Sequence, residues 1–464
     1  MAHSKEKSLC PAAGRCGGCQ WIDKDYQEQL KIKETRFRKL MEPYCKTDLI
    51  LGMKQPAHYR NKVHAAFGED RKHNIISGIY EEKSHRIVPL DRCHIENEKA
   101  DEIIVSIRGL MKSFKIRPYN EDTGFGLLRH VLIRIGHVTG QIMVVLVLSS
   151  PIMPSKNNFV KALRKLHPEI TTIVLNKNDR DTGMVLGDQE QVIYGKGYIE
   201  DEICGKRFRI SAKSFYQVNP VQAEILYRKA IEYAGLTGRE TVVDAYCGTG
   251  TIGIIAADKA GRVIGVEANQ DAVRDARNNA KRNQTTNIEF FKNDAGKALR
   301  EMAEQGVPVD LVLMDPPRGG SSEEFLEAAA RLAPPGVVYI SCNPDTLVRD
   351  LKYLTAKGYG VKRAVAVDLF PFTEHTEAVC LLSKLHTKQK IEVEPEMDEM
   401  DLTAAESKAT YEEIKGYVLE HTGLKVSNLY IAQIKQKCGI IERANYNLPK
   451  SENSRQPKCP PEKE

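Results

Sequence analysis

The sequence predicts an α/β protein in which a mainly β domain precedes a doubly wound, Rossmann-like domain with a parallel sheet. After about residue 206, short apolar strands alternate with helical segments, and this alternation is typical of a parallel sheet. Before that point, Val/Ile/Leu-rich runs such as 127–148 and 173–186 are separated by Gly, Asn and Asp, which predicts strands. With 464 residues, the chain is too long for one ordinary core.

The order of these patterns predicts five segments that differ in composition. They are a mainly β domain (1–205), a doubly wound domain (206–387), an acidic linker (388–405), a small helical appendage (406–450) and a disordered tail (451–464). In the linker, six of the ten residues in 392–401 are acidic. The appendage begins near Thr410-x-x-Glu413, a capping box that predicts a helix start.

The overall composition excludes a disordered chain and a membrane-spanning one. Hydrophobic residues make up 41% and charged residues 28%, close to the average of globular proteins. The longest apolar run, 142–148, is far too short to cross a bilayer, and residues 1–7 lack the apolar core of a signal peptide. We therefore expect a cytoplasmic protein, whose eleven cysteines stay reduced and are available as metal ligands or nucleophiles. The net charge of +6 permits a nucleic-acid partner without requiring one.

A glycine-rich turn after the first strand of the second domain predicts a nucleotide-type cofactor. Asp244-Ala-Tyr-Cys-Gly248-Thr-Gly250-Thr-Ile-Gly253 follows a strand and opens a helix, so its backbone can approach a ligand closely. Glu267 ends the next strand, where a carboxylate can accept hydrogen bonds from both ribose hydroxyls. NAD enzymes share this pattern, and a tight turn without a ligand is the simpler alternative.

The next two strands favour S-adenosylmethionine over NAD. Asp294 follows the third strand, at a place where its carboxylate can accept a hydrogen bond from an adenine amine. The fourth strand ends in Asp315-Pro316-Pro317-Arg318. A rigid Asp-Pro-Pro at the carboxyl edge of the sheet is typical of nucleic-acid methyltransferases and is not expected in a dehydrogenase.

The fifth strand, 337–341, is followed at once by Cys342, and Glu377 comes later in Phe370-Pro-Phe-Thr-Glu-His-Thr-Glu377. This pairing matches the needs of uracil chemistry. C5 of uracil is a poor nucleophile until a thiolate adds to C6, and a base must then remove the C5 proton. An inert buried thiol is the alternative interpretation of Cys342.

In this order, Asp-Pro-Pro-Arg, Ser-Cys-Asn-Pro and His-Thr-Glu resemble the motifs of the RNA uridine-5-methyltransferase family, which includes tRNA (uracil-54-C5) and 23S rRNA (uracil-C5) enzymes. The resemblance runs from Cys10 to about Leu385. It implies that Cys342 is the nucleophile and Glu377 the base. The residues that it matches to methyl-donor contacts, with Asp294 in a weaker version of the role, are Gln217, Tyr246, Glu267, Asp315 and Asp294. Phe215 and Arg318 are expected near the substrate from their positions alone.

The N-terminal cysteines resemble the iron–sulfur site of the rRNA branch of that family. Cys10-x5-Cys16-Gly-Gly-Cys19 and the distant Cys93 supply the four thiolates that a [4Fe–4S] cluster needs. Structural zinc is the alternative, although it usually takes two close Cys pairs. The tRNA enzymes typically lack this cluster, so the resemblance favours rRNA. Only nine residues precede Cys10, so the β-barrel that many rRNA members carry there is not expected.

The expected function is therefore S-adenosylmethionine-dependent methylation of uridine C5 in 23S rRNA by a monomer. The alternatives are a tRNA uracil-C5 methyltransferase, a non-covalent RNA amino-methyltransferase, and an RNA-binding assembly factor. The cations of a helix over Tyr26–Leu40, from Lys31 to Lys39, and Tyr59-Arg60-Asn61-Lys62 are expected to contact phosphates and an unstacked base. For the helix, a solvated charged face is an equally good alternative.

Overall fold

The computed structural model describes residues 9–385, apart from 83 and 181–183, together with residues 415, 416, 418, 419, 426, 427 and 431. Residues 1–387 form one compact unit and residues 388–464 a second. The predicted linker (388–405) and tail (451–464) lie outside the described residues, as does most of the predicted appendage (406–450). Within the described ranges, no helix combines the length and the apolar character needed to span a bilayer.

A seven-stranded sheet forms the centre of the predicted doubly wound domain. Its strands are β10 (Thr241–Ala245), β11 (Arg262–Glu267), β12 (Ile288–Lys292), β13 (Leu311–Met314), β14 (Gly336–Ser341), β15 (Tyr359–Val367) and β16 (Glu377–Lys384). Their order is β12-β11-β10-β13-β14-β16-β15. The first five strands are parallel, and β16 runs antiparallel to β14 and β15. The five strands predicted from apolar runs are all present.

Helices cover both faces of this sheet, which confirms the α/β, Rossmann-like fold. One apolar core lies between the sheet and α4 (Pro220–Ala234), α5 (Thr251–Ala256) and α6 (Gln270–Arg282). A second core lies on the opposite face, under α7 (Ala295–Glu304), α8 (Glu323–Leu332), α9 (Pro344–Ala356) and α1 (Tyr26–Met41). Short turns after the parallel strands bring their carboxyl ends to one edge, where ligands bind in such folds.

Residues 62–194 form another seven-stranded sheet, which is the first sheet in chain order, with the strand order β3-β2-β1-β4-β5-β6-β7; the sheet of the doubly wound domain is the second. Its strands are β1 (Lys62–Glu69), β2 (Ile75–Tyr80), β3 (Ile87–Pro89), β4 (Leu128–Ile135), β5 (Ile142–Leu148), β6 (Ile170–Lys177) and β7 (Gln189–Tyr194). Two helices that the sequence interpretation missed, α2 (Glu98–Ser113) and α3 (Lys156–Leu166), share a core with one face. Side chains of the other face join the core of the doubly wound domain.

The hairpin β8 (Ile199–Ile203) and β9 (Lys206–Ile210) follows the first sheet. The predicted boundary between residues 205 and 206 falls at the turn of this hairpin, so its two strands lie on either side of the boundary. The division into two domains at that point stays a prediction.

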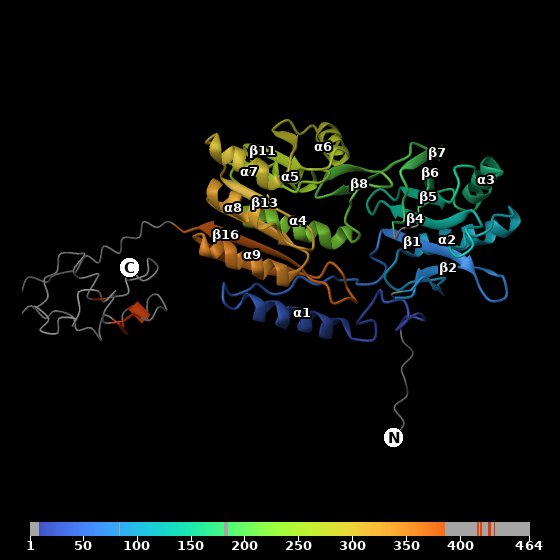
Figure 1. The fold of residues 1–464 in the computed structure, drawn as a ribbon, viewed down its shortest axis with the longest axis horizontal. Coiled ribbons are helices and arrows are strands. Elements are labelled where there is room, and N and C mark those ends of the chain that lie inside the picture. The colour runs from blue at the N-terminus through green and yellow to red at the C-terminus, as the bar shows by residue number, and fades with distance from the viewer. Residues whose placement is uncertain are drawn as a thin grey trace, which may run out of the picture. The chain divides into compact units, whose positions relative to one another are not determined.

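Helix α1 lies against the second sheet although it precedes the first sheet in the chain. It packs beside α9 and β15 (Figure 1). Asp25 caps its start by accepting hydrogen bonds from the backbone N–H groups of Gln27 and Glu28, and Phe37 and Met41 enter the core under the helix. The helix was predicted over nearly these residues.

Three of the residues predicted to contact RNA, Lys33, Tyr59 and Asn61, are instead buried inside the protein. Lys33 lies on the inner side of α1, where it pairs with Asp368. Tyr59 is buried as well, and its hydroxyl donates a hydrogen bond to the carbonyl oxygen of Pro371. Neither Lys33 nor Tyr59 is available to a phosphate or a base, because tertiary packing of α1 and of the 368–372 segment covers both. Arg36 and Arg38 remain on the exposed face of α1.

Candidate active site

The parallel strands bring their polar C-terminal residues to one edge of the second sheet. Asp244 lies in β10, Glu267 ends β11, and Asp294, Asp315 and Cys342 directly follow β12, β13 and β14. Adjacent strands are in continuous parallel register from β12 to β14, so these side chains share one edge. This edge is the predicted cofactor side of the domain.

The turn between β10 and α5 has the backbone conformation expected of a ligand-binding loop. Tyr246, Gly248 and Gly250 have positive φ angles of 61°, 55° and 80°. A side chain at Gly250 would also place its Cβ 2.7 Å from the Phe290 ring, so glycine is required there. Asp244 fixes the turn by accepting a hydrogen bond from the backbone N–H of Gly253 at 2.8 Å.

The two acids predicted to contact the cofactor from β11 and β12 differ in their surroundings. Glu267 accepts hydrogen bonds from the backbone N–H groups of Gly248 (3.1 Å) and Asn269 (2.8 Å), which hold its carboxylate beside the glycine turn. Asp294 is exposed and caps α7, with its Oδ1 accepting from the N–H of Lys297 at 3.0 Å. One oxygen of Asp294 is thus used in the cap, and both oxygens of Glu267 accept backbone hydrogen bonds.

Cys342 and Glu377 become neighbours through the antiparallel pairing of β14 with β16. Ser341 of β14 lies opposite Ala378 of β16. Cys342 directly follows Ser341 at the end of β14, and Glu377 directly precedes Ala378 at the start of β16. Cys342 lines a pocket of about 260 Å³, whose other walls include Arg318 and His375. The sequence placed Cys342 and Glu377 in one site, and the sheet register explains how they meet.

Burial and neighbouring charges shift the pKa values of this group strongly. Burial raises the pKa of Glu377 to about 8, and the negative charge of Asp315 adds to the shift. Burial alone raises the pKa of Asp315 to about 7. Burial, followed by the charges of Glu377 and Asp315, raises the pKa of the Cys342 thiol to about 11. The Arg318 guanidinium opposes the shifts at Glu377 and Cys342. Such shifts cluster at functional sites.

Two residues were not assigned to this site from the sequence: Tyr227, and Arg36, which was expected only among the phosphate-contacting cations of its helix. Arg36 lines the pocket beside Cys342, and its Nη2 lies 2.7 Å from Oδ2 of Asp345, at the start of α9. Tyr227 of α4 is fully buried, where it forms a hydrogen bond with Gln217 and feels the charges of Asp315 and Glu377. The local sequence does not indicate that either residue lies near Cys342 and Glu377, because α1 and α4 reach the site only through tertiary packing.

Of the expected substrate neighbours, Arg318 lines the pocket and Phe215 stands beside Gln217 in the chain with 71% of its surface exposed. An exposed aromatic ring is suited to stacking on an unpaired base.

The four N-terminal cysteines line one cavity of about 790 Å³, together with cationic residues that include Arg60 and Lys62. Burial and the proximity of Cys16 and Cys10 raise the pKa of the Cys19 thiol to about 12. The backbone N–H of Gly18 donates a hydrogen bond to Sγ of Cys16 at 3.4 Å. Burial also raises the pKa of Cys93. Among the described residues, no three His, Cys, Asp or Glu side chains are grouped closely enough to hold a metal ion.

Comparison with known families agrees with this geometry. Residues 25–385 match the model of the tRNA (uracil-5-)-methyltransferase family. The chain belongs to this family. It is therefore an RNA uracil-5-methyltransferase that uses S-adenosylmethionine.

Relatives of this uracil-5-methyltransferase include uncharacterized RNA methyltransferases of Halalkalibacterium halodurans and Oceanobacillus iheyensis. Both are 42% identical; the alignments cover 80% and 79% of this chain and 82% and 81% of the relatives. A similar solved structure is the Pyrococcus abyssi tRNA (uracil-54, C5)-methyltransferase in complex with S-adenosyl-L-homocysteine. It is 29% identical, with a TM-score of 0.67, and the match covers 79% of this chain and 86% of that one.

The electrostatic coupling of Cys342 to Glu377 predicts how the thiol of the methyltransferase reacts. In the free protein, we expect alkylation of Cys342 by iodoacetamide to rise with pH up to about 11, because the thiolate is the reactive form. Glu377→Gln removes a negative charge, which lowers the pKa of Cys342 and accelerates its alkylation at pH 9 several-fold. Peptide mass spectrometry measures the rate, with Cys45, whose charged neighbour is Asp48, as the internal control. An unchanged or slower rate at Cys342 would contradict the coupling.

Proposed function

We propose that the protein methylates C5 of a uridine in 23S rRNA through a covalent bond between Cys342 and C6 of the ring. The observation that carries the chemistry is the adjacency of a thiol and a buried carboxyl at one end of paired strands, beside a pocket. The 260 Å³ pocket next to Cys342 is large enough for one pyrimidine ring, so the target base must leave its stack to enter it.

In the first step of this mechanism, the Cys342 sulfur, having lost its proton, bonds to C6. The electron pair of the C5=C6 bond moves to form an enolate, which makes C5 nucleophilic. S-adenosylmethionine, when bound, supplies the methyl group that C5 takes up. Arg318 assists the first step, because its positive charge favours the thiolate form of Cys342.

In the last step, the Glu377 carboxylate removes the proton from C5. The C5–H electron pair restores the C5=C6 double bond, and the C6–S bond breaks with its electron pair remaining on Cys342. The raised pKa of Glu377, about 8, makes its carboxylate a stronger base than an exposed glutamate. Because of this pKa, the Glu377 carboxyl is ionised at neutral pH in only part of the free protein molecules.

We propose that the methyl donor lies along the strand edge. Glu267 is held beside the glycine turn and is oriented for ribose hydroxyls. Asp315 lies close enough to Cys342 and Glu377 to raise the pKa values of both, and Gln217 forms a hydrogen bond with the buried Tyr227, whose pKa the charges of Asp315 and Glu377 also raise. The sulfonium of the donor carries a positive charge, which these carboxylates favour. Tyr246 lies at the turn itself, with its ring 5.0 Å from that of Phe325.

These roles predict two different failures of the reaction. Cys342→Ala is expected to abolish methyl transfer while S-adenosylmethionine binding stays near normal, since the thiol acts on the ring. Glu377→Gln is expected to stall after methylation, with RNA still attached to Cys342, because the C5 proton is not removed. Denaturing gels display the adduct as a slow band. Methyl transfer by Cys342→Ala above a tenth of the wild-type rate excludes covalent activation, and absence of the band in Glu377→Gln removes it from the base role.

The choice of 23S rRNA rests on the four cysteines that line one cavity, as in the rRNA branch that the N-terminal motif resembles. tRNA is the second candidate, and it is favoured by the likeness to the Pyrococcus abyssi tRNA (uracil-54, C5)-methyltransferase. We give more weight to the cysteine cavity, because it belongs to this chain itself, and its Cys10 and Cys93 share an apolar core with Phe372.

Labelled methyl transfer to a 23S rRNA fragment with an unpaired uridine and to tRNA distinguishes these substrates. At matched concentrations, we expect faster labelling of the rRNA fragment. Binding of both RNAs is expected to fall steeply between two salt concentrations, whereas the preference persists, because phosphate contacts supply affinity without specificity. Efficient labelling of tRNA with unlabelled rRNA would overturn the assignment in favour of tRNA.

The cavity lined by Cys10, Cys16, Cys19 and Cys93 fits a [4Fe–4S] cluster in the chemistry of its donors. The N–H donated to Cys16 Sγ would stabilise a thiolate ligand. The cavity wall carries cations, such as Arg60 and Lys62, together with acids, such as Glu81 and Glu96. A cluster held there would tie residues 10–19 to Cys93 and order this part of the chain.

Anaerobically purified protein is therefore expected to be brown, with broad absorbance at the blue end of the visible spectrum and about four irons per chain. Cys93→Ser is expected to lower the iron content strongly, because it removes the one ligand far from the others in sequence. Cys204→Ser is the matched control, since Cys204 lies outside the cavity lining. Colourless protein with stoichiometric zinc would refute the cluster.

A further inference from the structure

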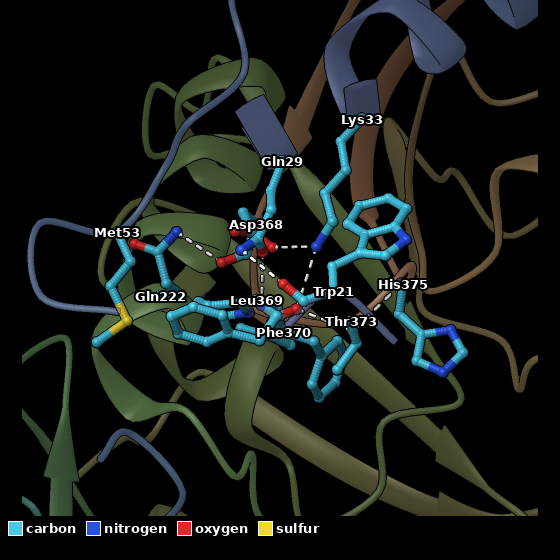
Figure 2. Close-up of polar contacts among 12 residues, drawn as sticks. Trp21, Gln29, Lys33, Met53, Gln222, Asp368, Leu369, Phe370, Thr373 and His375 are labelled. Carbon is cyan, nitrogen blue, oxygen red and sulfur yellow. Dashed lines mark hydrogen bonds and ion pairs between the residues drawn. The ribbon is translucent and has the colours of Figure 1, made fainter. Parts of the chain in front are cut away.

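A buried ion pair joins helix α1 to the segment that leads into the active-site loop. The Nζ atom of Lys33 lies 2.6 Å from Oδ1 of Asp368, and the two side chains are 1% and 0% exposed. Lys33 also donates a hydrogen bond to the carbonyl oxygen of Phe370 at 3.1 Å (Figure 2). Its ammonium group stands 5.5 Å from the centre of the Trp21 ring. One lysine thus holds two points of the 368–370 segment.

Further hydrogen bonds from the same side hold the residues around this pair. The Tyr26 hydroxyl donates to Oδ2 of Asp368 at 2.9 Å. The backbone of Phe372 is held at both ends, because its N–H donates to Oε1 of Gln29 at 2.8 Å and its carbonyl accepts from the N–H of Trp21 at 3.0 Å. Residues 21–33 therefore form hydrogen bonds along the chain from Asp368 to Phe372.

Helix α4 holds this segment from another direction. The Gln222 amide donates to the carbonyl oxygen of Asp368 at 3.0 Å, and the Asn219 amide donates to that of Leu369 at 2.9 Å. The held segment begins directly after β15, which ends at Val367. Its position is therefore determined by one strand and two helices.

The loop that continues from this segment forms the wall of the candidate active site. His375 and Thr376 line the pocket with Cys342. The loop turns at Thr373, whose hydroxyl donates to the carbonyl oxygen of Phe370 and accepts from the N–H of His375. Glu377 begins β16 directly afterwards. The Phe370 carbonyl therefore accepts hydrogen bonds from both Lys33 and Thr373, which connects the ion pair to the catalytic loop.

Net stability is a weak reason to bury such a pair. Taking a lysine and an aspartate out of water costs free energy that their attraction offsets only in good geometry, and apolar residues of similar volume often stabilise a core equally well. The pair does specify one arrangement of two segments that are distant in sequence. An apolar contact would allow α1 and the 368–370 segment to slide past each other. The two charges and three hydrogen bonds, from Lys33 to Asp368 and to the Phe370 carbonyl and from Tyr26 to Asp368, fix their separation and orientation.

We propose that Lys33 is a positioning residue for Glu377: through Asp368 and the Phe370 carbonyl, it fixes the loop that brings this carboxylate to the C5 proton. This inference rests on the proposed function. In the proposed mechanism, Lys33 contacts neither the uracil ring nor the methyl donor. Its loss therefore affects the proton-removal step more than the addition of Cys342 to C6, and a stalled covalent adduct is the signature.

The test compares variants at saturating RNA and S-adenosylmethionine, with adduct measured on denaturing gels. For Lys33→Met we expect a turnover rate at least ten-fold below wild type, a first turnover that still transfers methyl groups, and adduct accumulation as in Glu377→Gln. Lys33→Met with Asp368→Asn removes both charges and is expected to restore part of the turnover. Lys24→Met is the matched control with wild-type behaviour, because it removes only an exposed pair with Glu28 at 3.6 Å.

The outcomes separate this inference from the proposed function. Adduct in Glu377→Gln but none in Lys33→Met, with activity lost only in proportion to folded protein, would overturn the positioning role and leave Glu377 as the base. Adduct in neither variant would remove the base assignment and the inference together. If Lys33→Met does not fold, Lys33→Gln is used instead, because it removes the charge that pairs with Asp368 and keeps a polar side chain. A wild-type adduct level and wild-type turnover in folded Lys33→Gln would then contradict the inference.

Discussion

The antiparallel pairing of β14 with β16 is the constraint on which the active site depends. It places the end of one strand beside the start of the other, so that Cys342 and Glu377 meet although a helix and a long strand separate them in sequence. A shift of one residue in this pairing would turn Glu377 to the opposite side of the sheet. Both strands are almost wholly buried, so packing on both faces opposes such a shift. The chemistry of the site is therefore a consequence of sheet register.

Burial at this edge then determines the electrostatics of the site. Asp244, Asp315 and Glu377 are removed from water close to one another, which raises the pKa values to about 7, 7 and 8. Such carboxyls bind a proton more readily than exposed ones, and a nearby cation favours their ionised forms. The site thus combines an acceptor for a proton with carboxylates that suit a positively charged methyl donor. The positive charge of Arg318 offsets part of the effect of these carboxylates on Cys342 and so favours its thiolate form.

Much of the second domain could be predicted from sequence, because its buried parallel strands are short apolar runs with chemically distinctive residues at their ends. Helices α2 and α3 were missed, since they interrupt a stretch whose strongest signal is its Val/Ile/Leu-rich strands. The burial of Lys33 could not be predicted either. A lysine in a highly charged helix resembles a solvated residue until its partner, Asp368, is brought to it by tertiary packing. For the same reason, Arg36 and Tyr227 gave no signal of their positions at the site.

The N-terminal segment links the cysteine cavity to the catalytic loop. Cys10 and Cys93 share a small apolar core with Phe372, and the ring of His94 contacts that of Phe372 at 4.8 Å between centroids. Phe372 is also held through its backbone by Trp21 and by Gln29 of α1. The loop therefore has one support in the cysteine region and a second in the Lys33–Asp368 pair, and both act on residues just before Glu377. Packing is therefore continuous from the cysteine cavity to Phe372, five residues before Glu377 in the chain.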